Sequence, residues 1–274
     1  MSRSHAGTGP GGHRARKRFG QNFLHDEHII QRIIDALSPA AGEQLVEIGP
    51  GRGALTRHLV DSGADLQAIE LDRDLAGYLQ SLYHHNPHFT LHQGDVLKFD
   101  FATLGETPGS LRVIGNLPYN ISTPCLFHLL GYRHLIRDML FMLQREVVNR
   151  MAAAPGEKDY GRLSIMLQYH CRIEPLFEVP PGAFSPPPRV TSAIVRLVPL
   201  QQPREPALDE ALFATVVRHA FSQRRKTLKN ALQGLITPES PLDWPVDPGQ
   251  RPERLEVSDF VRISNALTRQ ERKQ

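Results

Sequence analysis

A glycine-rich loop between a strand and a helix is the feature that most constrains the fold of this chain. Residues 44–49 form a short apolar segment that ends in the sequence Gly-Pro-Gly-Arg-Gly at residues 49–53, and residues 54–60 have the pattern of a helix. In such a unit the glycines let the backbone approach a ligand closely, and the helix N-terminus offers unpaired N–H groups. The segment therefore indicates an α/β fold that binds a nucleotide-like ligand at this turn.

Glu70 strengthens that prediction. It stands 21 positions after Gly49, at the end of a second predicted strand, residues 66–70. A carboxylate at this place accepts hydrogen bonds from the ribose hydroxyls of a nucleoside. Without Glu70 the loop is about equally consistent with a tight turn that binds nothing, whereas the two features together favour nucleoside binding.

The ligand that these residues predict is S-adenosylmethionine rather than a nicotinamide dinucleotide. The loop lacks the Gly-x-Gly-x-x-Gly spacing that grips a pyrophosphate. Glu47 is placed to face the cationic amino group of a methionine. Asp95 and Val96 follow the third predicted strand, where a carboxylate and a backbone N–H can bind adenine. Each of these features fits a ligand without phosphates.

Strands and helices alternate along most of the chain. The predicted parallel strands are residues 44–49, 66–70, 89–92, 111–114 and 139–143. Helical segments fill most of the gaps between them, which is typical of a mostly parallel sheet covered on both faces. Two later strands, residues 172–179 and 193–198, are joined by a proline-rich loop and are expected to form an antiparallel edge.

A change of character near residue 200 divides the chain. A polar, proline-containing segment, residues 201–206, separates the strands from three segments with helical spacing: residues 211–221, 225–235 and 258–268. We therefore expect three parts: a flexible basic tail (1–15), a methyltransferase catalytic domain (16–200) and a small all-helical C-terminal domain that binds RNA or the ribosome (207–274).

The tetrapeptide Asn116-Leu117-Pro118-Tyr119 follows a predicted strand, so it should lie at the carboxyl edge of the sheet, where ligands bind in such folds. An adenine N6 amine is a poor nucleophile, because its lone pair is delocalised into the ring. The Asn116 side-chain carbonyl and a backbone carbonyl of the turn can accept both N–H groups, which would direct the lone pair at a methyl group. Tyr119 is expected to stack on the base; the alternative is a turn with a core tyrosine.

Phe184 is a second aromatic candidate. It begins the sequence Phe-Ser-Pro-Pro-Pro-Arg-Val, in which the prolines stiffen the loop. We expect its ring to close the pocket over a flipped base from the opposite face. Together with residues 116–119, it completes the predicted catalytic set.

Positive charge is concentrated in two places. The net charge is only +3, but residues 211–237 contain no Asp or Glu. Two basic clusters are predicted to contact RNA: Arg16, Lys17, Arg18, Arg224, Arg225, Lys226 and Lys229. For any single one of them, a solvated surface charge is the simpler interpretation.

Composition excludes several other classes of protein. Two cysteines, Cys125 and Cys171, are too few for a disulfide scaffold and indicate a reducing, cytoplasmic location. No apolar run is long enough to cross a membrane. His84, His88 and His92 are separated by an Asn-Pro pair that breaks any helix between them, so we expect no metal site.

Taken together, these motifs resemble the ribosomal RNA adenine N6,N6-dimethyltransferase family, and specifically its bacterial small-subunit (16S) branch. The resemblance extends from about Arg16 to Leu267. Further matching segments are residues 16–24, 144–147, 160–163, 223–228 and 251–255.

The resemblance implies a Rossmann-like, S-adenosylmethionine-dependent methyltransferase domain with a helical C-terminal domain. The implied substrate is a pair of adjacent adenosines in the 3′-terminal hairpin loop of 16S ribosomal RNA, each dimethylated within an immature 30S subunit. We expect a monomeric enzyme. With the residues derived above, cofactor contacts are expected at Asn22, Leu24, Glu47, Gly49, Gly51, Glu70, Leu71, Asp95, Val96 and Asn116.

Two alternatives remain open. A methylase of the macrolide-resistance type, acting on large-subunit RNA, shares the Asn-Leu-Pro-Tyr pattern, although residues 251–255 argue against it. A non-catalytic RNA-binding assembly factor on the same fold should have lost its cofactor or base contacts. Glu70, Asp95, Asn116 and Tyr119 are all present, which argues for an enzyme.

Overall fold

The computed structural model of the chain describes residues 21–203, 205–222, 226–236 and 242–271. These residues form two compact units. The first contains the described residues up to Arg145 together with Pro175–Pro199, and the second contains Glu146–Glu174 and the described residues from Leu200 onward. The change of character near residue 200 thus coincides with one passage between the units, while residues 146–174 belong to the second unit.

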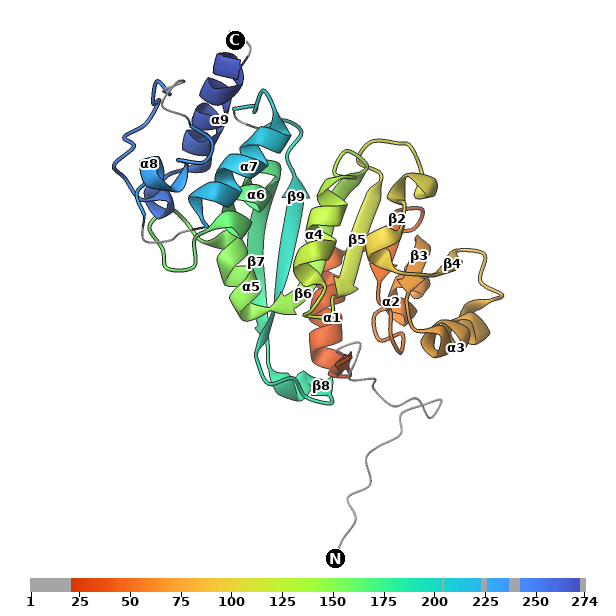
Figure 1. The fold of residues 1–274 in the computed structure, drawn as a ribbon. Helices are drawn as coiled ribbons and strands as arrows, with labels where there is room; N and C mark the ends of the chain where they lie inside the picture. Colours follow the sequence, from red (N-terminus) through yellow and green to blue (C-terminus); the bar gives the residue numbers. More distant parts are fainter. Residues whose placement is uncertain (1–20, 204, 223–225, 237–241, 272–274) are drawn as a thin grey trace, which may run out of the picture. The chain divides into compact units, whose positions relative to one another are not determined.

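Most of the described strands form one seven-stranded sheet (Figure 1). Across the sheet, the order is β4 (Phe89–Gln93), β3 (Asp65–Glu70), β2 (Gln44–Ile48), β5 (Leu111–Asn116), β6 (Ile136–Gln144), β9 (Ser192–Pro199) and β7 (Cys171–Val179). The first five are parallel neighbours, and β9 runs antiparallel to β6. The predicted mostly parallel sheet with an antiparallel edge is confirmed.

The strand order reverses at β2. From β2 the chain first builds outward through β3 and β4, and it then returns to the other side of β2 with β5. Such a reversal leaves a crevice at the carboxyl ends of the two central strands. The two strand ends lie close together there. A Cβ atom on Gly115 would lie only 2.6 Å from the main-chain oxygen of Ile48.

Helices connect the strands and make up much of the second unit. The α-helices are α1 (Glu27–Leu37), α2 (Thr56–Asp61), α3 (Arg73–Tyr83), α4 (Ser122–Leu130), α5 (Arg145–Ala152), α6 (Arg162–His170), α7 (Glu210–Ala220), α8 (Leu228–Ala231) and α9 (Val257–Glu271). Short 3₁₀ helices are η2 (Val96–Lys98), η3 (Phe101–Leu104), η4 (Pro181–Ala183) and η5 (Pro252–Arg254). Helix α8 is shorter than the predicted 225–235, and Gly234 weakens any continuation of it.

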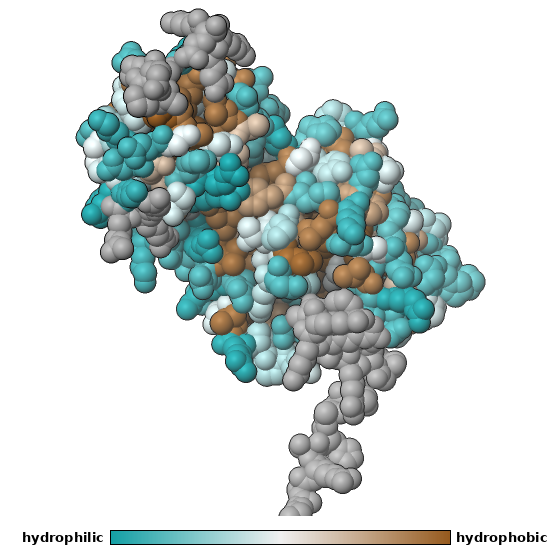
Figure 2. All heavy atoms as spheres, in the orientation of Figure 1, coloured by the Kyte–Doolittle hydropathy of each residue, from teal (hydrophilic) through white to brown (hydrophobic). Residues whose placement is uncertain are grey.

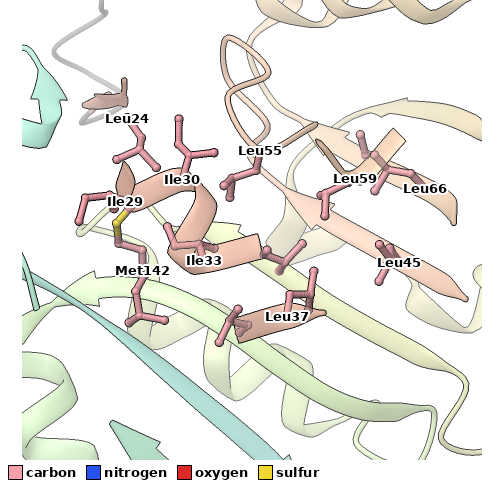
Figure 3. Close-up of a cluster of buried hydrophobic side chains, with 14 of the residues drawn as sticks. Leu24, Ile29, Ile30, Ile33, Leu37, Leu45, Leu55, Leu59, Leu66 and Met142 are labelled. Atoms are coloured by element: carbon pink, nitrogen blue, oxygen red, sulfur yellow. The ribbon is translucent and has the colours of Figure 1, made fainter. Parts of the chain in front are cut away.

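Helix α1 carries the largest share of one core cluster. Asp26 caps its start by accepting from the Ile29 N–H at 3.1 Å. The apolar stripe of the helix belongs to a cluster of buried side chains that also includes residues of β2, α2, β3 and β6 (Figure 3). The labelled members of this cluster are Leu24, Ile29, Ile30, Ile33, Leu37, Leu45, Leu55, Leu59, Leu66 and Met142. The periodicity that predicted the helix is therefore the periodicity of its buried face.

Figure 2 shows hydrophilic side chains over most of the visible face, with hydrophobic residues in smaller patches between them. The large hydrophobic residues that are exposed come from separate parts of the sequence: Leu71, Leu82, Leu176, Val190, Leu200 and Leu208. None of the helices in the described ranges combines the length and apolar character needed to cross a membrane.

A buried guanidinium ties the end of α1 to the sheet. Arg112 of β5 donates to both oxygens of Asp138 at 2.8 and 3.0 Å and to Glu43 at 2.7 Å. It also donates to the main-chain oxygens of Leu37 at 2.7 Å and Ser38 at 3.4 Å. These carbonyls lie at the helix end, where the backbone lacks intrahelical partners.

Arg112→Ala is expected to lower the free energy of unfolding by about 3–5 kcal/mol, because Asp138 would remain buried with only the Arg196 guanidinium, 3.9 Å away. Arg137→Ala is the matched control. Arg137 is exposed and pairs with the same Glu43, so its loss should cost less than about 1 kcal/mol. Denaturant unfolding measures both, and equal losses would contradict a special role for Arg112.

Candidate active site

A cavity opens in the first unit at the crevice between β2 and β5. Its walls are residues 21–24, the loop after β2, the end of β3 with the start of α3, the turn after β4, and residues 116–121. The residues predicted from the sequence to contact a cofactor all line it: Asn22, Leu24, Glu47, Gly49, Gly51, Glu70, Leu71, Asp95, Val96 and Asn116. Five segments that are separate in the sequence thus face one space.

Glu70 links the glycine-rich loop to the segment that precedes α3. One carboxylate oxygen accepts from the Gly51 N–H at 3.1 Å, and the other accepts from the Asp72 N–H at 2.8 Å. Gly51 has a φ of 61°, and a Cβ atom there would lie 3.3 Å from the Phe23 ring, so the loop requires glycine at this position. Burial raises the pKa of Glu70 above its usual value. Each of its oxygens keeps a second lone pair that can accept a hydrogen bond from a hydroxyl group.

Glu47 lies deeper, at the end of β2. Its side chain is 2% exposed, and it accepts a hydrogen bond from the Thr56 hydroxyl at 2.7 Å. Burial raises the pKa of Glu47 to about 8, and the nearby charge of Glu70 adds to the rise. At neutral pH the Glu47 carboxyl therefore holds a proton, and a cation in the cavity would favour its ionised form.

The turn after β4 closes another side of the cavity. Asp95 starts η2 by accepting from the Leu97 N–H at 3.0 Å, and Val96 is buried beside it. Leu71, which also lines the cavity, is 51% exposed and adds apolar surface to it. A carboxylate beside apolar side chains suits a flat ring that carries an amino group.

Residues 116–119 form the wall on the side of β5. Asn116 ends that strand, and its amide Nδ2 donates to the main-chain oxygen of Asn22 at 3.1 Å. This bond assigns the amide orientation and leaves the side-chain oxygen as an acceptor. Leu117 is tied to β6 through its N–H, which donates to the Met142 oxygen at 3.3 Å. Tyr119 is half-buried, and its hydroxyl lies 2.8 Å from the Ser192 hydroxyl.

Phe184 is not among the residues that line the cavity. It lies in β8 (Phe184–Ser185), which pairs antiparallel with β1 (Phe23–Leu24), and its ring is 3% exposed within the core cluster. Phe184 pairs with Leu24, so it supports a strand that forms part of the cavity wall. Stacking on a base stays a prediction, and it requires the ring to leave the core.

Several lining residues were missed by the sequence interpretation. Gln21 donates to the Asp72 carboxylate at 3.4 Å, and the Arg52 guanidinium lies 4.3 Å from the centre of the Phe23 ring. These contacts hold residues 21–24 against the start of α3 and against the glycine-rich loop. Arg52 lies within that loop in the sequence, but no local pattern predicts its contact with Phe23.

The predicted RNA-binding residues are divided by what the structure describes. Arg16, Lys17, Arg18, Arg224 and Arg225 lie outside the described residues. Lys226 and Lys229 are exposed in the second unit. Within the described part of the chain, no three His, Cys, Asp or Glu side chains are grouped so that they could hold a metal ion.

Comparisons with known proteins agree on one family. The family described as Ribosomal RNA adenine dimethylase matches residues 12–269. Ribosomal RNA small subunit methyltransferase A of Pseudomonas putida is 60% identical over 259 residues, covering 94% of this chain and 97% of the relative. The protein of the same name from Pseudomonas aeruginosa is 59% identical over 255 residues, covering 93% and 95%.

Solved structures share the fold. A dimethyladenosine transferase from Plasmodium falciparum has a TM-score of 0.75 and 24% identity, covering 91% of this chain and 98% of that one. The 23S rRNA methyltransferase ErmE has a TM-score of 0.66 and 23% identity, covering 90% and 100%. The Rossmann-like methyltransferase fold predicted from the sequence is confirmed.

Glu47 gives the folded chain a defined pH dependence. Its pKa is about 8 in the folded state against 4.5 for an unperturbed carboxyl. Between these two pKa values the folded state binds the proton more tightly than the unfolded state does. The stability that this proton binding contributes is therefore fully present below the lower pKa. It is lost as the pH rises towards the upper one, by about 1.4 kcal/mol for each pH unit.

Unfolding of the wild type and Glu47→Gln in denaturant, from about pH 5 to pH 8, isolates this term. The wild type should lose stability relative to the variant as the pH rises, because glutamine cannot ionise. If the two stability curves stay parallel, Glu47 is ionised in the folded chain and the assignment is wrong.

Proposed function

The chain belongs to the ribosomal RNA adenine dimethylase family, and we propose that it dimethylates the N6 amines of two adjacent adenosines in the 3′-terminal hairpin loop of 16S ribosomal RNA with S-adenosylmethionine. The observation that carries the proposal is a shared cavity. Asn116 and Tyr119, suited to an adenine amine, face the same space as Glu70 and the glycine-rich loop, suited to a nucleoside. The curated relatives named as small-subunit methyltransferases support the choice of RNA.

The residues around the cavity fit the cofactor. The Glu70 carboxylate accepts from two backbone N–H groups, and in this proposal it would also accept hydrogen bonds from the ribose hydroxyls. Asp95, Val96 and Glu47 all line the cavity. Asp95 would accept from the adenine amine, the Val96 N–H would donate to the ring, and Glu47 would face the methionine amino group. When bound, S-adenosylmethionine supplies a methyl group that its sulfonium already activates. The protein therefore needs to position the reactants rather than to activate the donor.

Asn116 orients the acceptor. The hydrogen bond from its Nδ2 to the Asn22 carbonyl orients the amide group. The side-chain oxygen can then accept an N–H of the adenine amine. A second acceptor, a main-chain carbonyl of the turn, would hold the other N–H, so that the nitrogen lone pair points along the line of transfer. Tyr119 supports the base by stacking. The surplus proton becomes acidic after transfer and leaves to solvent, so no side-chain base is needed.

The setting of the reaction is part of the same proposal. The substrate is the immature 30S subunit, and the enzyme acts as a cytoplasmic monomer without a metal ion. Lys226 and Lys229, both exposed, would contribute phosphate contacts together with the remaining basic residues of the two predicted clusters. Neither lysine lines the cavity, so their contribution is to RNA affinity rather than to the chemistry.

Mutations should separate the binding of the cofactor from the positioning of the target base. Asn116→Ala should reduce turnover below detection while cofactor affinity changes only a few-fold, because the amide acts on the base. Glu70→Ala should weaken cofactor binding by about 1.5–3 kcal/mol, the range for a hydrogen bond to a charged group. Calorimetry with the cofactor and single-turnover methylation measure the two effects. Normal turnover of Asn116→Ala, or unchanged affinity of Glu70→Ala, would refute the corresponding role.

Transfer of labelled methyl groups to 30S particles from a strain without this activity, and in parallel to large-subunit RNA, tests the function as a whole. Up to four methyl groups on two neighbouring adenosines of 16S RNA are expected, located by mass mapping of RNA fragments. Label on large-subunit RNA would instead assign the chain to the resistance type. A failure to label either RNA would favour a binding factor.

A further inference from the structure

Ser192 brings a buried hydroxyl to the edge of the sheet where the cavity lies. Strand β9 runs antiparallel to β6, so its first residue lies beside the last residue of β6, and Ser192 pairs with Gln144. The preceding carbonyl, of Thr191, accepts from the Arg145 N–H at 3.0 Å and fixes this end of the strand. Ser192 is fully buried. A parallel strand would begin at the opposite edge, so only the antiparallel strand can supply its first residue here.

Tyr119 is the side chain that Ser192 contacts. The two hydroxyl oxygens are 2.8 Å apart, and either can donate. The main-chain oxygen of Tyr119 accepts from the Ser122 hydroxyl at 3.1 Å. The tyrosine is thus held at both ends, its backbone by the first residue of α4 and its hydroxyl by the first residue of β9. Between these two anchors, the half-buried side chain lines the cavity.

We propose that Ser192 is a positioning residue that fixes the ring of Tyr119 for the target adenine. Ser192 does not itself line the cavity, so it acts through the tyrosine. A tyrosine without a bound hydroxyl can rotate about its side-chain bonds, whereas a hydrogen bond to a rigid strand leaves one ring orientation. In-line transfer depends on the orientation of the base, and the ring sets the plane on which the base rests. The inference rests on the proposed function.

Dimethylation makes the fixed ring more important. The same amine must be presented twice, and after the first transfer it carries a methyl group and one N–H fewer. Asn116 and the turn then hold the base with one hydrogen bond fewer, so stacking on Tyr119 provides a larger share of its positioning. Loss of the Ser192 bond should therefore affect the second transfer more than the first.

The test compares Ser192→Ala, Tyr119→Phe and the double variant on 30S particles. Each single change removes the same hydrogen bond, so kcat should fall about three- to tenfold. The released product should contain more monomethyladenosine relative to dimethyladenosine, and cofactor affinity should stay within about twofold of the wild type. The double variant should be no worse than either single variant, because the bond can be lost only once.

Ser164→Ala is the matched control for lost stability. Ser164 is also fully buried, and it accepts a hydrogen bond from the Gly161 N–H at 3.1 Å, but it lies in the second unit. Its product ratio should equal that of the wild type. Tyr119→Phe keeps the test decisive should Ser192→Ala fail to fold.

Three results would overturn the role of Ser192. These are a wild-type kcat and product ratio in Ser192→Ala, losses that multiply in the double variant, and a Ser164→Ala product ratio that shifts as much. A wild-type protein that transfers no methyl group to 30S particles would overturn the proposed function, and the role of Ser192 with it.

Discussion

The close parallel pairing of β2 with β5 is the constraint on which the rest of the first unit depends. It places Ile48 opposite Gly115 at the point where the strand order reverses, so the segments that follow the two strands diverge and leave a crevice. The glycine-rich loop lines one side of this crevice, and Asn116 lines the other. Gly115 is the position that permits the approach, because any side chain there would meet the Ile48 backbone.

Two buried carboxyl groups give this cavity its electrostatic character. Glu70 is bound by backbone N–H groups, which offset part of the cost of its burial, whereas Glu47 has only the Thr56 hydroxyl. Their mutual repulsion raises the pKa of Glu47 further. A ligand that carries a positive charge would relieve this cost, whereas a pyrophosphate would increase it. The electrostatics thus favour the same ligand as the loop spacing.

The local sequence predicted those parts of the fold and site that depend on neighbouring residues. The apolar period of residues 29–37 gave a helix whose buried face is that stripe, and the alternation of strands with helices gave the parallel sheet. The strand–glycine–helix unit, the carboxylate of Glu70 and the turn at Asn116 were recognisable because each follows directly on the strand that positions it. Such segments carry their own geometry, since parallel strands end at one common edge.

Only the tertiary structure decided which distant segments meet. The pairing of Leu24 with Phe184 joins strands 160 residues apart and buries a ring for which the sequence suggested a place in the pocket. The insertion of β9 beside β6 likewise brings Ser192 to Tyr119. The sequence by itself determined the class of fold, the glycine-rich loop and the Asn-Leu-Pro-Tyr turn, because these rest on residues adjacent in the chain. The contacts that orient them depend on strand pairing across the whole sheet, for which the sequence contains no local signal.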